Sequence, residues 1–96
     1  MAEIRDKETN FQNAINTYQK ALKVYTVENS PFDYAKAQTN LGYVYLRLAE
    51  IRDKKTNAQK AIDASQEALK AYAIEKYPID YAKTQTNLEC AEGLLL

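Results

Sequence analysis

Apolar residues recur along the first third of the chain at steps of three and four positions. They are Phe11, Ala14, Ile15, Tyr18, Ala21, Leu22 and Tyr25. This spacing places them on one side of an α-helix, so the pattern predicts an amphipathic helix over about 9–29. Thr9 and Gln12 have the spacing of a capping box and favour a helix start at Thr9.

A second helical pattern follows a turn at Glu28–Pro31. Ser30 is a suitable N-cap and Pro31 a suitable first helical residue, which predicts a helix over about 31–52. Its apolar positions are Tyr34, Ala35, Leu41, Gly42, Tyr45, Leu48 and Ala49. A glycine inside a helix costs roughly 1 kcal/mol relative to alanine, so Gly42 predicts the close approach of a neighbouring helix.

Both patterns return after 47 residues. Residues 2–41 and 49–88 align without a gap and are identical at 26 of 40 positions. An internal repeat of this length indicates a helical solenoid, here with further helices over about 57–76 and 78–92. We therefore expect an all-α fold of four antiparallel helices in one domain, 1–96, with repeats at about 2–48 and 49–95.

The composition narrows the classes of function. The 13 basic residues equal the 13 acidic residues, which disfavours a nucleic-acid or anionic-membrane surface. There is no histidine, and the single cysteine, Cys90, has no imidazole to activate it and no internal partner for a disulfide. No apolar run approaches a membrane span of about 18 residues. We expect a cytoplasmic protein without a metal or cofactor that is not an enzyme.

The repeated residues resemble the tetratricopeptide repeat. The resemblance rests on Leu41, Gly42 and Tyr45 in the second helix and on Ala61 and Ala68 in the third. It departs from that family in its longer period, 47 rather than 34 residues, and in Ser65, which stands where an aromatic residue is usual. The resemblance implies helices in the family's order B-A-B-A and a scaffold that binds a protein or peptide on the concave side of its A helices.

The resemblance also implies which residues face the ligand. They are Lys36, Thr39, Asn40, Tyr43 and Arg47 in the first A helix, with Lys83, Thr86, Asn87 and Cys90 in the second. An asparagine amide can donate to and accept from a peptide backbone, and lysine can hold a carboxylate. The alternative is that Asn40 and Asn87 only hydrogen-bond one helix to the next.

The two ends of the repeat array suggest self-association. Apolar residues lack a covering helix at Phe11, Ile15, Tyr18 and Leu22 in the first helix and at Leu94, Leu95 and Leu96 at the other end. Uncovered apolar surfaces of this size mark association sites, which predicts a dimer or an end-to-end stack. A structural, self-assembling repeat unit is therefore the alternative function.

Two further groups of residues have simpler interpretations. Four tyrosines lie on the apolar stripes and are expected in the core with their hydroxyl groups at its edge: Tyr18, Tyr25, Tyr45 and Tyr72. Acidic and basic residues alternate around the predicted A-to-B turn, including Glu50, Arg52 and Asp53. We expect a solvated charge cluster there and no metal site.

Overall fold

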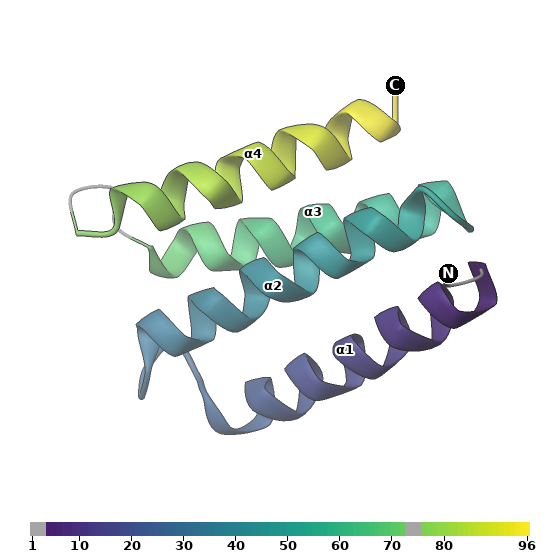
Figure 1. The fold of residues 1–96 in the computed structure, drawn as a ribbon. Coiled ribbons are helices and arrows are strands. Elements are labelled where there is room, and N and C mark those ends of the chain that lie inside the picture. Colours follow the sequence, from purple (N-terminus) through teal and green to yellow (C-terminus); the bar gives the residue numbers. More distant parts are fainter. Residues whose placement is uncertain (1–3, 73–75) are drawn as a thin grey trace.

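A computed structural model describes residues 4–72 and 76–96 of the chain. These residues form four α-helices and no strand: α1 (Ile4–Val24), α2 (Pro31–Ala49), α3 (Lys54–Ala71) and α4 (Pro78–Leu94). Figure 1 shows that successive helices run in opposite directions and lie side by side, with α1 and α4 at opposite edges. The predicted all-α fold of four antiparallel helices is confirmed.

The predicted helix boundaries need correction. The first helix starts at Ile4 rather than near Thr9, and the third starts at Lys54 rather than near residue 57. Thr9 lies inside α1, so the capping box predicted from Thr9 and Gln12 is wrong, and the N-cap of α3 is Asp53. Asp53 adopts the left-handed region with φ 44°, which aspartate tolerates better than most residues.

The turn between α1 and α2 is held by hydrogen bonds between Thr26 and Asn29 rather than by the Ser30 side chain. Ser30 is the N-cap of α2, as predicted, but its side chain makes no capping hydrogen bond. Instead, the Thr26 backbone N–H donates to Asn29 Oδ1 at 2.8 Å, and the Asn29 backbone N–H donates to Thr26 Oγ1 at 3.1 Å. The repeat carries Ala73 and Lys76 at these positions, so the second copy lacks this pair in its sequence.

The packing follows the order of the chain. Each helix packs on the next one, and α2 also contacts α4, whereas the described backbone of α1 approaches only α2. The main core lies between α2 and α3 and includes side chains from all four helices: Ile15, Leu41, Val44, Tyr45, Leu46, Leu48, Ala61, Ile62, Leu88 and Ala91. The helices thus form a row in which α2 and α3 are covered on both sides.

Gly42 marks the closest approach of α2 to α3. A Cβ atom placed on Gly42 would lie 3.0 Å from Ser65 Oγ and 3.3 Å from the Ala61 carbonyl oxygen, both in α3. These separations are shorter than ordinary van der Waals contacts, so only glycine fits without movement. The prediction made from the glycine inside this helix is confirmed.

Ser65 has a buried hydroxyl group without a partner. The residue is fully buried, and its Oγ atom makes no hydrogen bond to the described residues. A buried polar group in this state costs about 1–3 kcal/mol of desolvation. We therefore expect Ser65→Ala to raise the free energy of unfolding by about 1 kcal/mol, measured by urea denaturation monitored by circular dichroism. A destabilised Ser65→Ala variant would contradict the assignment of an unpaired hydroxyl.

A second, smaller core lies where α2 begins, α3 ends and α4 begins. Phe32, Tyr72 and Tyr77 form an aromatic cluster with ring centroids 4.9–6.0 Å apart. They come from the start of α2, the end of α3 and the N-cap of α4. Ala35 and Ala68 fill the space beneath them. The cluster therefore joins three helices at their ends.

Candidate functional site

A groove of about 370 Å³ lies between α2 and α4, which are neighbours in space although α3 separates them in sequence. Six residues line it: Thr39, Asn40, Tyr43, Lys83, Thr86 and Asn87. Residues 39 and 40 of α2 recur as residues 86 and 87 of α4, because the two helices are copies 47 residues apart. All six residues belong to the predicted ligand face, and the fold brings them together.

The two asparagine amides in this groove have no hydrogen-bond partner among the residues that the structure describes. Asn40 and Asn87 are half-buried, and the structure shows no hydrogen bond from either side chain to another described residue. Neither amide is among the fully buried polar atoms without a partner, so both reach solvent. The alternative that Asn40 and Asn87 hydrogen-bond one helix to the next has no support in this geometry.

Thr39 has a different role from the other residues of the groove. Its hydroxyl lies 2.8 Å from that of Thr84, and Thr84 Oγ1 donates to the Asp80 carbonyl oxygen at 2.9 Å. The single hydroxyl hydrogen of Thr84 is already donated to the Asp80 carbonyl oxygen, so Thr39 must be the donor in the hydrogen bond between the two hydroxyl groups. Thr84 is fully buried and ties α4 to α2. Sequence reasoning missed Thr84, although it stands where the first repeat has Ala37.

Tyr43 and Arg47 lie one turn apart at the edge of the groove. The Tyr43 side chain is 48% exposed, and the Arg47 guanidinium lies 5.5 Å from the centre of its ring. Arg47 also forms an ion pair with Glu50, so its charge is partly balanced. The predicted contacts Arg47, Lys36 and Cys90 do not line the groove, and Lys36 and Cys90 are exposed.

Most of the residues expected to drive self-association are covered within the chain. Ile15 is 3% exposed and belongs to the main core, so it offers no surface to a second copy. Phe11, Tyr18, Leu22 and Leu94 are partly buried against the same core. At the C-terminal end, by contrast, Leu95 and Leu96 are exposed, and self-association through them stays a prediction.

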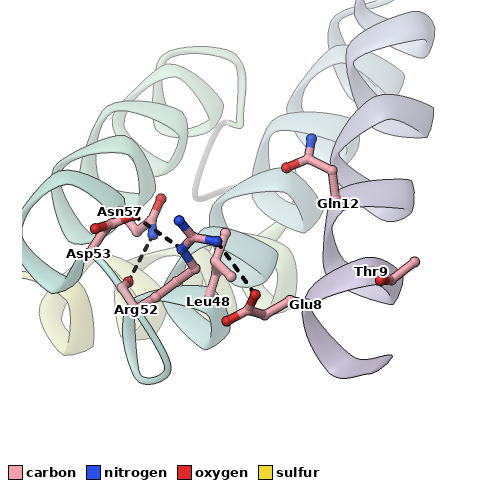
Figure 2. A pocket seen from close by; sticks show the side chains of 7 residues that line it. All are labelled: Glu8, Thr9, Gln12, Leu48, Arg52, Asp53 and Asn57. Carbon is pink, nitrogen blue, oxygen red and sulfur yellow. Dashed lines mark hydrogen bonds and ion pairs between the residues drawn. The ribbon is translucent and has the colours of Figure 1, made fainter. Parts of the chain in front are cut away.

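A second pocket lies where the turn between α2 and α3 meets the start of α1. Its lining is Glu8, Thr9, Gln12, Leu48, Arg52, Asp53 and Asn57. Figure 2 shows the Arg52 guanidinium between Asp53 and Glu8. Its Nε atom lies 3.1 Å from Asp53 Oδ2 and its Nη1 atom 3.4 Å from Glu8 Oε2, while Asn57 Nδ2 donates to the Arg52 carbonyl oxygen at 3.0 Å. Asp53, and then Glu8, raise the pKa of the Arg52 guanidinium. One exposed cation is thus balanced by two carboxylates, which agrees with the predicted solvated charge cluster.

The tyrosines divide into core and surface residues. Tyr45 and Tyr72 are buried, and burial raises the pKa of both hydroxyl groups, as expected for core residues. Tyr25 is exposed, so its predicted place in the core is wrong. Its position follows the last residue of α1, where the helix and its apolar stripe have ended.

A polar network covers the outer side of the contact between α2 and α3. The Tyr34 hydroxyl donates to Glu67 Oε1 at 2.8 Å, and Glu67 pairs with Lys70. The Lys70 ammonium and then the Tyr34 hydroxyl lower the pKa of the Glu67 carboxyl group, while burial raises the pKa of Tyr34. The Tyr34 hydroxyl, the Glu67 carboxylate and the Lys70 ammonium thus pair with one another. We therefore assign this network a role in packing α2 against α3.

The described part of the chain was also searched for metal sites and membrane-spanning helices. No group of three or more histidine, cysteine, aspartate or glutamate residues there could hold a metal ion. No helix over the described ranges is long and apolar enough to cross a membrane. Comparison with known proteins adds no assignment, because no family model, no curated protein and no solved structure matches the chain.

Proposed function

We propose that this chain is a tetratricopeptide-like scaffold that binds an extended segment of another protein in the groove between α2 and α4. The observation that carries the proposal is the pair of unpartnered amides. Asn40 and Asn87 occupy equivalent positions on two neighbouring helices, line the same groove and make no hydrogen bond to the described residues. An amide pair of this kind matches the alternating donors and acceptors of a peptide backbone.

The packing of the helices supports the scaffold. In B-A-B-A order, α2 and α4 are the A helices, and they contact each other in addition to their neighbours in sequence. Their contact creates the groove, and Thr39 and Thr84 fix its base by a hydrogen bond between the helices. A groove on a preformed helical surface loses little conformational entropy when a ligand binds.

The remaining groove residues indicate what the segment carries. The exposed Tyr43 ring offers an amphipathic surface, on which an apolar side chain of the ligand can pack. Lys83 lines the opposite side, and its ammonium group favours an acidic residue or a terminal carboxylate. We therefore propose an extended ligand with one apolar and one acidic side chain.

A library of linear peptides displayed on phage, selected against the purified chain, tests this function. Selected peptides are expected to bind the Asn40→Ala/Asn87→Ala variant about tenfold or more weakly, because each lost hydrogen bond contributes roughly 0.5–1.5 kcal/mol. The measurement is isothermal titration calorimetry on synthetic copies of the peptides. Circular dichroism of the variant shows whether the fold persists.

A matched variant controls for loss of asparagine elsewhere. Asn10 and Asn13 are exposed residues of α1, a helix that contributes no residue to the groove. Asn10→Ala/Asn13→Ala is expected to leave the affinity for the same peptides unchanged. Peptides that bind the parent chain and the groove variant equally well would contradict the proposed site.

A further inference from the structure

The hydrogen bond between Thr39 and Thr84 fixes how α4 is aligned along α2. The two hydroxyl oxygens lie 2.8 Å apart, and the residues are 45 positions apart in the sequence. The two helices run in the same direction (Figure 1), and identical side chains tilt equally along parallel helices, so the two threonines lie at the same level. A residue of α4 is therefore level with the α2 position 45 places before it.

This alignment orders the groove residues along the helix axes. Lys83 lies level with position 38 of α2, and Asn87 lies level with position 42. Asn40 and Tyr43 belong to α2 itself. With a rise of about 1.5 Å per residue, Lys83 and Tyr43 are separated by about 7.5 Å along the groove. Asn40 and Asn87 lie between those two levels and are offset from each other by about 3 Å in the same direction.

The offset of the two amides matches an extended polypeptide. Asn40 comes from the α2 wall of the groove and Asn87 from the α4 wall. In an extended chain, the backbone N–H and C=O groups of one residue point to one side, and those of the next residue point to the other side, about 3.3 Å further along. One amide on each wall can therefore bind the backbone groups of two successive ligand residues.

The same alignment fixes the spacing of the ligand's side chains. Every second side chain of an extended chain points to the same face, and such side chains are about 6.6 Å apart. Lys83 and Tyr43, about 7.5 Å apart along the groove, therefore meet side chains two positions apart. The Lys83 ammonium pairs with a carboxylate, and the exposed Tyr43 ring packs on an apolar side chain. The side chain between them points to solvent.

We infer that the groove recognises a three-residue segment in which an acidic residue and an apolar residue flank one unrestricted residue. The inference rests on the proposed function and specifies its ligand. Residues one or three positions apart have side chains on opposite faces of an extended chain, so they cannot contact Lys83 and Tyr43 together. Residues four positions apart share a face, but their separation of about 13 Å exceeds that of Lys83 and Tyr43.

Synthetic peptides with blocked termini test the spacing by isothermal titration calorimetry. Each carries one glutamate and one leucine, in either order, at a spacing of one, two, three or four positions in a background of serine and threonine. The blocked ends prevent a terminal carboxylate from replacing the glutamate. Spacing two is expected to bind the parent chain about tenfold or more tightly than the other spacings. Equal affinities, or tightest binding at another spacing, would overturn the inference.

The Asn40→Ala/Asn87→Ala variant separates this inference from the proposed function. Peptides that bind at every spacing and lose affinity in this variant would overturn the spacing and leave the proposed function standing. Failure of every spacing to bind would also overturn the inference, and the peptides selected from the phage library would then decide the proposed function on their own.

Reversal of the charge at position 83 tests the assignment of the acidic position. Lys83→Glu is expected to weaken binding of the spacing-two peptide about tenfold or more, and to favour the same peptide with lysine in place of glutamate. Lys20→Glu makes the same change at an exposed position of α1, which contributes no residue to the groove, and is expected to keep the preference for glutamate. Equal losses in the two variants would overturn the assignment of Lys83.

Discussion

Tyr72→Ala is expected to lower the free energy of unfolding by about 3–5 kcal/mol, the range for truncating a large buried aromatic side chain. Tyr72 is 4% exposed and contacts both Phe32 and Tyr77 in the aromatic cluster. Its loss leaves a cavity where α2, α3 and the start of α4 meet. Domains of this size are stable by about 5–15 kcal/mol, so the change removes a large share of that stability.

Urea denaturation followed by circular dichroism measures the effect, and Tyr43→Ala is the matched control. Tyr43 is 48% exposed and packs in neither core cluster, so its removal is expected to change the free energy of unfolding by less than about 1 kcal/mol. Equal losses for the two variants would show that the aromatic cluster does not hold the helix ends together.

Gly42→Leu is expected to destabilise the fold by about 3 kcal/mol, at the upper end of the usual cost of overpacking a core. The first atom of the new side chain already meets Ser65 and the Ala61 carbonyl, and the rest of it has no free space between α2 and α3. Because leucine forms helices better than glycine, helix propensity alone predicts the opposite sign. The sign of the change therefore separates close packing from propensity.

Gly93→Leu makes the same substitution at an open position. No atom lies within 4 Å of a Cβ built on Gly93, which is in the last turn of α4. This variant is expected to keep or slightly raise the stability of the parent chain, by less than about 1 kcal/mol. If Gly42→Leu behaved like Gly93→Leu in thermal denaturation, the close approach of α2 and α3 would be refuted.

The sequence predicts the faces of the helices better than their ends. Apolar spacing depends on the helical period alone, so Leu41 and Tyr45 could be placed in the core, and Asn40 on another side, without a structure. The internal repeat then places Asn87 on the equivalent side of another helix. Their meeting in one groove depends on the contact between α2 and α4, which only the resemblance to a known repeat suggested.

Helix ends depend on context that a local pattern does not contain. The segments Ile4–Lys7 and Ile51–Lys54 have the same sequence, yet the first lies within α1 and the second makes a turn and starts α3. The second copy directly follows α2, and the chain has to reverse there, with Asp53 in the left-handed region. Because these residues are identical in the two copies, their sequence alone could not show that the first helix starts at Ile4 or that Asp53 caps the third.

The sequence pattern also did not predict the buried polar contact between the two repeats of the chain. Thr84 replaces Ala37, a change that looks minor when the two repeats are aligned. Its importance comes from Thr39 on the neighbouring helix, whose hydroxyl it meets at 2.8 Å. Only the spatial arrangement shows that this departure from the repeat supports the candidate site.

Because α1 lies at the edge of the row, it is expected to unfold locally before the other helices. Among the described helices, α1 packs on α2 alone, so it can detach while the contacts among α2, α3 and α4 persist. Local unfolding of this kind exposes its backbone amides to hydrogen exchange at a lower free energy than global unfolding. The α2–α4 groove does not include any residue of α1. The first helix is thus expected to open at a lower free energy than the rest of the described fold, while the α2–α4 groove keeps all its lining residues.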